Sequence, residues 1–131
     1  MTDITVTKGS VSLLNNGPSF RVTAGATITA GQAVYINGTS GADLVDGDAA
    51  NTAKCVGIVV APQDAVSGDV LDVAGPGCVV GGFSGMTAGN LLFVSATAGA
   101  LADAAATKSK PVARAITTTE ILVTLEGLDP A

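Results

Sequence analysis

The chain offers few groups that could carry out chemistry, because it contains no histidine. This removes the usual general base and the catalytic triads that depend on an imidazole. The segment Gly82-Phe-Ser-Gly85 is similar to a nucleophile elbow, but that motif requires a glycine two residues after the serine, and position 86 is Met. We interpret Ser84 as part of a glycine-rich turn. The sequence therefore predicts no catalytic residues and a protein that is not an enzyme.

A metal site could form only where oxygen ligands cluster, and the one such cluster is Asp43, Asp46, Asp48 and Asn51. A hard cation such as Ca²⁺ takes oxygen ligands of this kind, but the spacing is not that of an EF-hand and no glutamate follows to complete the shell. The alternatives are a cation-binding loop and a solvated loop tip, of which we favour the second. We predict no bound metal and no cofactor.

The two cysteines, Cys55 and Cys78, are too few for a disulfide scaffold, and both lie in apolar segments that resemble strands. No further Cys or His is available to complete a zinc site with them. We predict two buried free thiols, with a bridge between them as the alternative.

The charge and hydrophobic content of the chain limit the kinds of partner that it can bind. The net charge is −5, which disfavours nucleic-acid binding, since that needs a basic face. The longest strongly apolar run, residues 55–61, is far shorter than the ~20 residues that a spanning helix requires. The first eight residues contain no apolar signal core, so we expect no secretion signal. Charged residues make up 13% of the chain, about half the usual share, and this predicts a surface that other subunits cover.

Glycine and proline content predict an all-β fold. The chain has 17 Gly and 5 Pro, and its apolar residues are mostly Ala and Val, with one Tyr, three Phe and no Trp. Short strands joined by tight turns are typical of such a composition. We expect a small barrel-like or β-clip-like module in which residues 56–60 form a strand that is buried on both faces.

An internal repeat accounts for the order of these strands. Ile28-Thr-Ala-Gly31 matches Met86-Thr-Ala-Gly89 at an offset of 58 residues, and Val34-Tyr-Ile matches Leu92-Phe-Val at the same offset. After a gap, residues 54–60 match residues 110–116, and Asp69-Val-Leu matches Glu120-Ile-Leu. A shared bias toward small residues could imitate part of this pattern. We predict two pseudo-repeats of about 55 residues each, too small to bury separate cores.

The predicted organisation is a flexible N-terminal arm, residues 1–9, followed by one β domain over residues 10–131 with pseudo-repeats at about 20–75 and 78–127. The arm alternates Ile4 and Val6 with threonines but is polar and terminal, so we expect it to be ordered only against a partner. Tyr35 and Phe93 occupy equivalent positions and are predicted to be core or interface residues rather than a ligand platform. Phe20 and Phe83 are predicted to lie in the core.

Four segments carry a resemblance to a known family: residues 26–35, Val56-Gly-Ile-Val-Val60, Asp69-Val-Leu-Asp-Val73 and Lys110-Pro-Val-Ala-Arg-Ala-Ile116. In the spacing of its glycines and valines, over roughly residues 20–127, the chain resembles the capsid decoration (cement) proteins of tailed bacteriophages. The resemblance implies an all-β module on the outer surface of the expanded head, in the virion, assembled in the host cytoplasm. It also implies a homotrimer that clamps neighbouring major capsid subunits.

On this interpretation the N-terminal residues contact the major capsid protein or a sister subunit. The predicted interface residues are Thr2, Ile4, Val6, Lys8, Val11 and Leu13. Two other functions remain open. One is a tail-fibre or head-fibre module that adheres to the host surface. The other, which we disfavour, is a β-clip nucleotide hydrolase, because neither Arg21 nor Arg114 lies in a phosphate-binding motif.

Overall fold

The computed structural model describes residues 3–15, 17–37, 41–48, 54–106 and 110–125. The protein is all-β, as its sequence predicts. An N-terminal segment contains β1 (Thr5–Val6), a 3-10 turn η1 (Lys8–Ser10) and β2 (Ser12–Leu13). The first half then contains β3 (Ser19–Thr23), β4 (Ile28–Thr29), β5 (Ala33–Asn37), β6 (Gly41–Leu44), β7 (Cys55–Ala61), β8 (Asp64–Ala65) and β9 (Val70–Ala74). The second half contains β10 (Val79–Gly81), β11 (Phe83–Ser84), β12 (Leu91–Val94), β13 (Leu101–Ala102), β14 (Pro111–Ala115) and β15 (Glu120–Val123).

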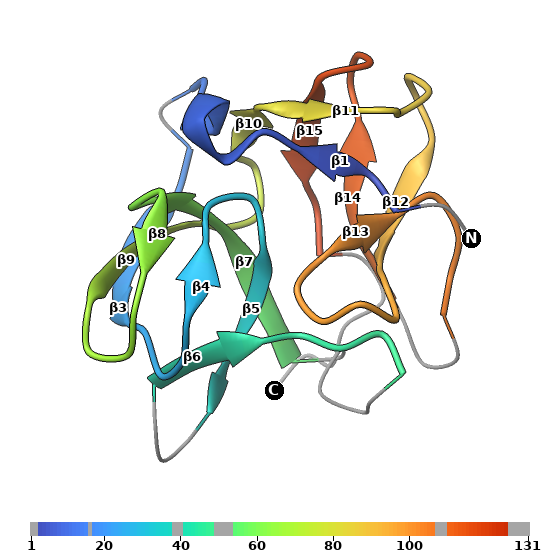
Figure 1. The fold of residues 1–131 in the computed structure, drawn as a ribbon. Coiled ribbons are helices and arrows are strands. Elements are labelled where there is room, and N and C mark those ends of the chain that lie inside the picture. The colour runs from blue at the N-terminus through green and yellow to red at the C-terminus, as the bar shows by residue number, and fades with distance from the viewer. Residues whose placement is uncertain (1–2, 16, 38–40, 49–53, 107–109, 126–131) are drawn as a thin grey trace.

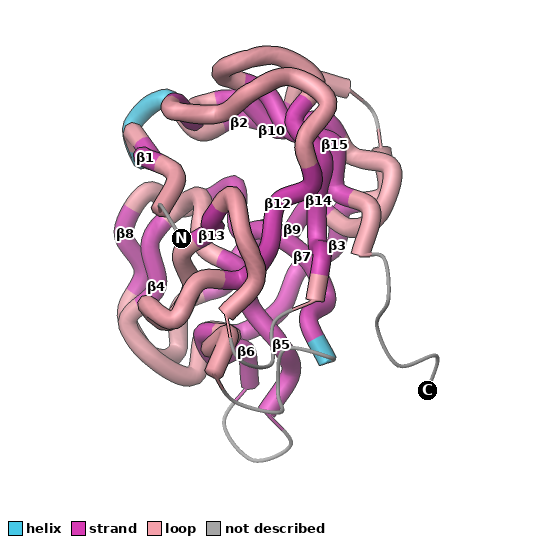
Figure 2. Tube along the Cα trace, turned by 90° about the vertical axis from the view of Figure 1, so that its right-hand side faces the viewer, coloured by secondary structure: helices cyan, strands magenta, loops and turns pink. Residues whose placement is uncertain are grey.

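Each half forms one main antiparallel sheet. The first has the strand order β3-β9-β7-β5-β6 and the second the order β13-β12-β14-β15-β10-β2, while β1 pairs with β11 and β4 with β8 in two small ribbons. Figure 1 shows the first half in blue to green below and the second in yellow to red above. Figure 2 shows the same strands from the side. Among the described residues neither sheet closes into a barrel.

The two sheets repeat the same topology. Strands β3, β9, β7, β5 and β6 correspond in order to β10, β15, β14, β12 and β13. The register agrees as well, because Ala33 lies opposite Ile58 and Leu91, 58 residues later, lies opposite Arg114. The pairing shifts after Val34 in the first sheet and after its counterpart Leu92 in the second. The repeat read from the sequence is therefore present in the hydrogen bonding.

One step of the sequence alignment was wrong. Matching Asp69 to Glu120 would make Val70, which is 58% exposed, equivalent to the fully buried Ile121. In the sheets, Val73 lies opposite Val59 and Ile121 lies opposite Ala115, so Val73 is the counterpart of Ile121, and both side chains are buried. The difference is three residues, an odd number, which reverses the two faces of a strand. The alignment matched two acidic residues, Asp69 just before β9 and Glu120 at the start of β15, which do not occupy equivalent positions in the two sheets.

Matched glycines form the turn before β5 in the first half and before β12 in the second half. Gly31 has φ of 93° and Gly89 has φ of 91°, a region that favours glycine because a Cβ crowds the backbone there. The amide of Gly31 donates to the Val59 carbonyl at 2.7 Å, and the amide of Gly89 donates to the Ala115 carbonyl at the same distance. Each glycine lies two residues before its strand, β5 or β12, so the two turns are equivalent.

The core is shared between the halves. One cluster lies inside the first half and includes Ile28, Val34, Val59 and Leu71. The larger cluster contains most buried residues of the second half together with Ile4 and five first-half residues, Ala33, Val45, Cys55, Ile58 and Ala74. Of these, Ala33, Ile58 and Ala74 lie in register across β5, β7 and β9. Strand β7 is central in its sheet, and Gly57, Ile58 and Val59 are all buried, as predicted for a strand covered on both faces.

The aromatic residues follow the prediction in part. Phe83 is buried, and Tyr35 is partly buried against the larger cluster. Phe20 is 39% exposed, so its prediction as a core residue was wrong. Its strand β3 lies at the end of its sheet, where no neighbouring strand covers its outer side among the described residues.

The two turn glycines provide a matched test of the fold. Gly89→Ala is expected to lower the free energy of unfolding by about 1–2 kcal/mol, because a Cβ there meets no atom within 4 Å and only the backbone conformation is strained. Gly31→Ala is expected to cost more, since its Cβ would also collide with Val6 of the N-terminal segment. Urea denaturation of both variants measures the difference. Equal losses would contradict the close approach of Val6 to Gly31.

Candidate functional site

The N-terminal segment lies against the second half of its own chain. Asp3 forms a bridge with Ala102, and the Ile4 amide donates to the Leu101 carbonyl at 2.8 Å. The Ser95 hydroxyl donates to the Asp3 carboxylate at 2.5 Å, and Ser95 is itself 1% exposed. The Ile4 side chain is 5% exposed and belongs to the larger core cluster. The segment is thus anchored by one buried apolar side chain and one partly buried polar contact.

The pairing continues through β1. Thr5 and Val6 lie opposite Ser84 and Phe83 of β11, and the Thr7 amide donates to the Gly82 carbonyl at 2.9 Å. Figure 1 shows this segment, in dark blue, crossing in front of the second half. The prediction of an arm that is ordered only against a partner was therefore wrong for residues 3–9. The physical reason is that Ile4 and Val6 find apolar surface and an open strand edge on their own domain.

The predicted interface residues are placed unequally by this docking. Ile4 is buried, and Val6, Val11 and Leu13 are partly buried against the same cluster. Lys8 is exposed. Thr2 lies outside the described residues. Ile4 therefore has no free surface for a partner in this arrangement.

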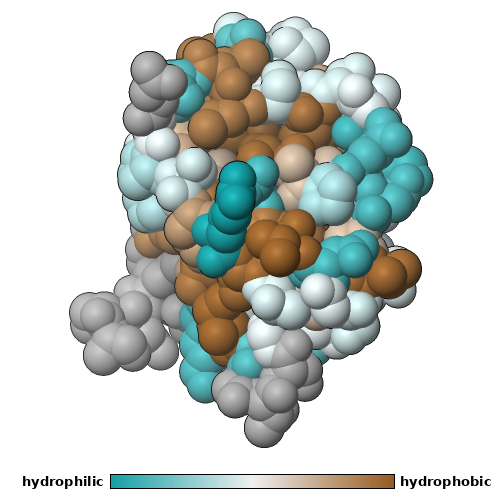
Figure 3. Space-filling view, turned by 90° about the vertical axis from the view of Figure 1, so that its left-hand side faces the viewer, coloured by the Kyte–Doolittle hydropathy of each residue, from teal (hydrophilic) through white to brown (hydrophobic). Residues whose placement is uncertain are grey.

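A hollow of about 380 Å³ lies under the N-terminal segment, between the two halves. Its walls are Ile4, Val6 and Lys8 from that segment, the turn at residues 29–32 from the first half, and Gly99 with Ala100 from the second. Most of these side chains are small or apolar. Figure 3 shows one face of the molecule, on which hydrophobic residues lie in patches beside hydrophilic ones. This is where three predicted interface residues meet both pseudo-repeats.

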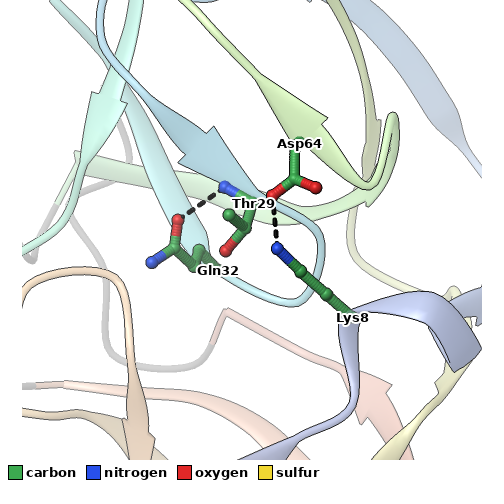
Figure 4. Close-up of polar contacts among 4 residues, drawn as sticks. All are labelled: Lys8, Thr29, Gln32 and Asp64. Carbon is green, nitrogen blue, oxygen red and sulfur yellow. Dashed lines mark hydrogen bonds and ion pairs between the residues drawn. The ribbon is translucent and has the colours of Figure 1, made fainter.

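Polar contacts at the hollow hold its wall in place (Figure 4). The Lys8 ammonium lies 2.6 Å from a carboxylate oxygen of Asp64, with side chains that are 50% and 58% exposed. The Thr29 amide donates to Gln32 Oε1 at 2.8 Å. An exposed ion pair of this kind contributes about 0–1 kcal/mol. The Asp64 carboxylate neutralises the Lys8 ammonium. These contacts can hold neighbouring segments in position, but neither of them pairs a nucleophile with a general base.

The acidic loop shows no metal geometry in the residues that can be described. Asp43 accepts a hydrogen bond from the Leu44 amide, and Asp46 accepts one from the Asp48 amide, both at 2.9 Å. Asn51 lies outside the described residues. Across those residues, no group of three His, Cys, Asp or Glu side chains is arranged to hold a metal ion. The described carboxylates of Asp43 and Asp46 therefore accept hydrogen bonds from nearby backbone amides.

The side chains that could act as nucleophiles, Ser84 and the two cysteines, lie in strands or in the core. Ser84 lies in β11 opposite Thr5. Cys55 and Cys78 are free thiols, both buried, as predicted. Burial raises the pKa of Cys55 from 9.0 to about 12, and this effect outweighs the smaller, opposing effect of hydrogen bonds between the thiol and the backbone of Gly57 and Val34. Burial also raises the pKa of Cys78. Both thiols therefore stay protonated and unreactive near neutral pH.

Several residues that hold the N-terminal segment in place could not be recognised from the sequence. Asp3, Asp64 and Ser95 are ordinary polar residues in turns or short strands, and their partners lie 56 to 92 residues away along the chain. Only Lys8 and the apolar alternation of Ile4 and Val6 pointed to the N-terminal segment. Within the described part of the chain, no helix is long and apolar enough to cross a membrane.

Comparisons with known proteins add no family to this geometry. No protein-family model matches the chain, and no curated protein matches it significantly.

The docking of the N-terminal segment predicts a stability difference between neighbouring residues. Ile4→Ala is expected to lower the free energy of unfolding by about 2–4 kcal/mol, because it empties space in the core. Thr5→Ala, at an exposed position, is the control and is expected to change it by less than about 0.5 kcal/mol. Urea denaturation measures both. An Ile4 variant no less stable than the Thr5 variant would mean that the segment does not dock in solution.

The Cys55 thiol predicts a loss of stability in alkali. Its folded pKa is raised, so the stability that comes from keeping the thiol protonated is complete below about pH 9 and is lost as the pH rises toward about 12. Other groups titrate in this range as well, and the readout is therefore the comparison with Cys55→Ala. Between about pH 7 and about pH 11, the wild-type unfolding midpoint should fall further than that of the variant. Parallel curves would contradict the raised pKa.

Proposed function

We propose that this chain is a structural virion protein that binds the outer surface of an expanded phage capsid and holds neighbouring major capsid subunits together. The proposal rests on the resemblance of residues 20–127 to capsid decoration proteins. The observation that supports it is a surface poor in charge and rich in exposed apolar side chains. Large apolar residues that are 39% to 59% exposed are Leu14, Phe20, Ile36, Val66, Val70 and Ile116.

These features fit a protein that is covered by other subunits. Buried interface cores are depleted of charged residues, and this chain has 13% charged residues. Scattered exposed apolar residues are common on monomers, but here they coincide with a low density of charge. The partners in this proposal are the major capsid protein and further copies of the chain. No catalytic step is part of it.

The docked N-terminal segment changes how the contact would be made. Because Ile4 is buried in its own domain, a free arm no longer serves as the clamp. The available contact surface consists instead of the exposed apolar residues, Lys8 at the hollow, and open strand edges. Val6, Val11 and Leu13 would then act by shaping this surface from beneath.

Co-sedimentation with expanded empty heads of the encoding phage tests the proposal. The purified protein should sediment with expanded heads, appear as regular protrusions in images, and bind unexpanded heads much less. Lys substitution of each exposed apolar residue in turn should abolish binding at one position at least. Ser67→Lys and Thr118→Lys, at exposed neighbouring positions, are the controls. Adhesion to host cells without affinity for heads would favour the fibre-module alternative instead.

A further inference from the structure

The outer face of the second-half sheet carries a row of mostly apolar side chains. Residues that lie directly opposite one another in an antiparallel sheet have their side chains on the same face. Val79 lies opposite Leu122, and Leu122 lies opposite Arg114. Arg114 in turn lies opposite Leu91 of β12. The Leu14 amide donates to the Val79 carbonyl at 2.8 Å, so Leu14 extends the row onto the N-terminal segment. We call these five residues the outer row.

The equivalent row of the first half is covered. The counterparts of three outer-row residues are fully buried against the second half, and they are Ala33, Ile58 and Ala74. The outer row is more open, because Leu14 is 49% exposed, Arg114 is exposed and the other three residues are partly exposed. A sheet face that packs in one half is therefore left accessible in the other.

Arg114 places a positive charge within this row. Its Nη1 donates to the Gly89 carbonyl at 2.7 Å, which holds the side chain along the sheet. The two ion pairs of the described residues involve Lys8 and Arg21, so the Arg114 guanidinium has no carboxylate partner in that part of the chain. A guanidinium has five N–H donors and binds carboxylates through charge-assisted hydrogen bonds. The outer row is thus suited to a partner that brings a carboxylate between apolar side chains.

The turn between β8 and β9 carries this combination of groups. Val66 and Val70 are 59% and 58% exposed, the highest values among the large apolar residues that the structure describes. Between them lies the exposed Asp69, whose Oδ2 accepts a hydrogen bond from the Val66 amide at 3.0 Å. A Cβ placed on Gly68 would meet no atom within 4 Å, so the turn projects from the surface. We call residues 66–70 the tip.

The tip and the outer row lie on opposite sides of the molecule. Figures 1 and 2 both show β8, which leads into the tip, away from β14 and β15, which carry the centre of the outer row. The tip of one copy therefore cannot reach its own outer row, and a contact between the two surfaces joins different copies. Such a contact is head-to-tail, because different surfaces meet, and it either closes into a ring or extends into a filament.

From this complementarity we infer that the tip of one copy docks on the outer row of a second copy, with the Asp69 carboxylate on the Arg114 guanidinium. The two valines of the tip then pack against the leucines beside Arg114. The occupant is a second copy because the chain itself supplies both the apolar groups and the carboxylate that this face needs. The inference gives surfaces to the self-association in the proposed function, and closure into a ring of three rests on that function. The contact itself can be tested without a capsid.

Two single variants and their mixture test the contact. Arg114→Glu disables the outer row and Val70→Lys disables the tip, so each variant alone should associate at least about tenfold more weakly than wild type. An equimolar mixture should form a two-chain complex, because the first variant keeps its tip and the second keeps its outer row. Sedimentation velocity over a concentration series measures the mass, compared with 12.7 kDa for one chain, and circular dichroism verifies the fold.

Further variants separate the specific contact from general effects of charge or folding. Lys54→Glu makes the same change of charge as Arg114→Glu at an exposed position outside both surfaces, and it should leave association intact. Asp69→Asn removes the charge but keeps an acceptor for the Val66 amide. It should weaken association in wild type and have little further effect when Arg114→Ala is already present. If a charged variant does not fold, Arg114→Ala and Val66→Ser form the milder pair for the mixing experiment.

Four results would overturn the inference. They are a monomer at all concentrations, association of Arg114→Glu equal to that of wild type, a mixture of the two single variants that stays monomeric, and an outer row that binds only an added capsid protein. A ring of another size that both single variants disrupt would support the contact and reject the trimer. Failure to bind heads with an intact ring would reject the proposed function alone.

Discussion

The burial of one first-half sheet face against the second half is the constraint on which the rest of the structure depends. Ala33, Ile58 and Ala74 lie in register across three strands and are fully buried in the larger cluster. Each half has too few residues to bury a sufficient core alone. Since this face is covered by the second half, the two pseudo-repeats form one folding unit.

The same packing makes the repeats unequal. The counterparts of that buried row are Leu91, Arg114 and Leu122, which lie in register in the second sheet and are partly or fully exposed. The N-terminal segment adds strands to the second half, β1 beside β11 and β2 beside β10, and meets the first half through the side chains of Val6 and Lys8. Two copies of one topology therefore expose different surfaces. In the function proposed above, such differences would allow one subunit to contact several unlike neighbours.

Part of the site could be predicted from the sequence. The alternation of Ile4 and Val6 marked the N-terminal segment, and these residues do line the hollow between the halves. The sequence did not reveal that this segment docks on its own domain, because β11 and Leu101, which receive it, lie about 80 to 100 positions away along the chain. Likewise, nothing in the local sequence distinguishes Ser95 or Asp64 from other polar residues. Their hydrogen-bonding partners are decided by the packing of the two halves.

The sequence by itself determined the all-β class, the repeat at an offset of 58 residues, the matched glycines at 31 and 89, and the buried free thiols. These follow from local conformational preference and from hydrophobic alternation, which a chain carries in its own order. Only the tertiary structure decided that the N-terminal segment docks on its own domain and that Phe20 is exposed. The physical reason is that burial and strand pairing depend on which distant segment arrives, and alternation alone cannot specify that neighbour.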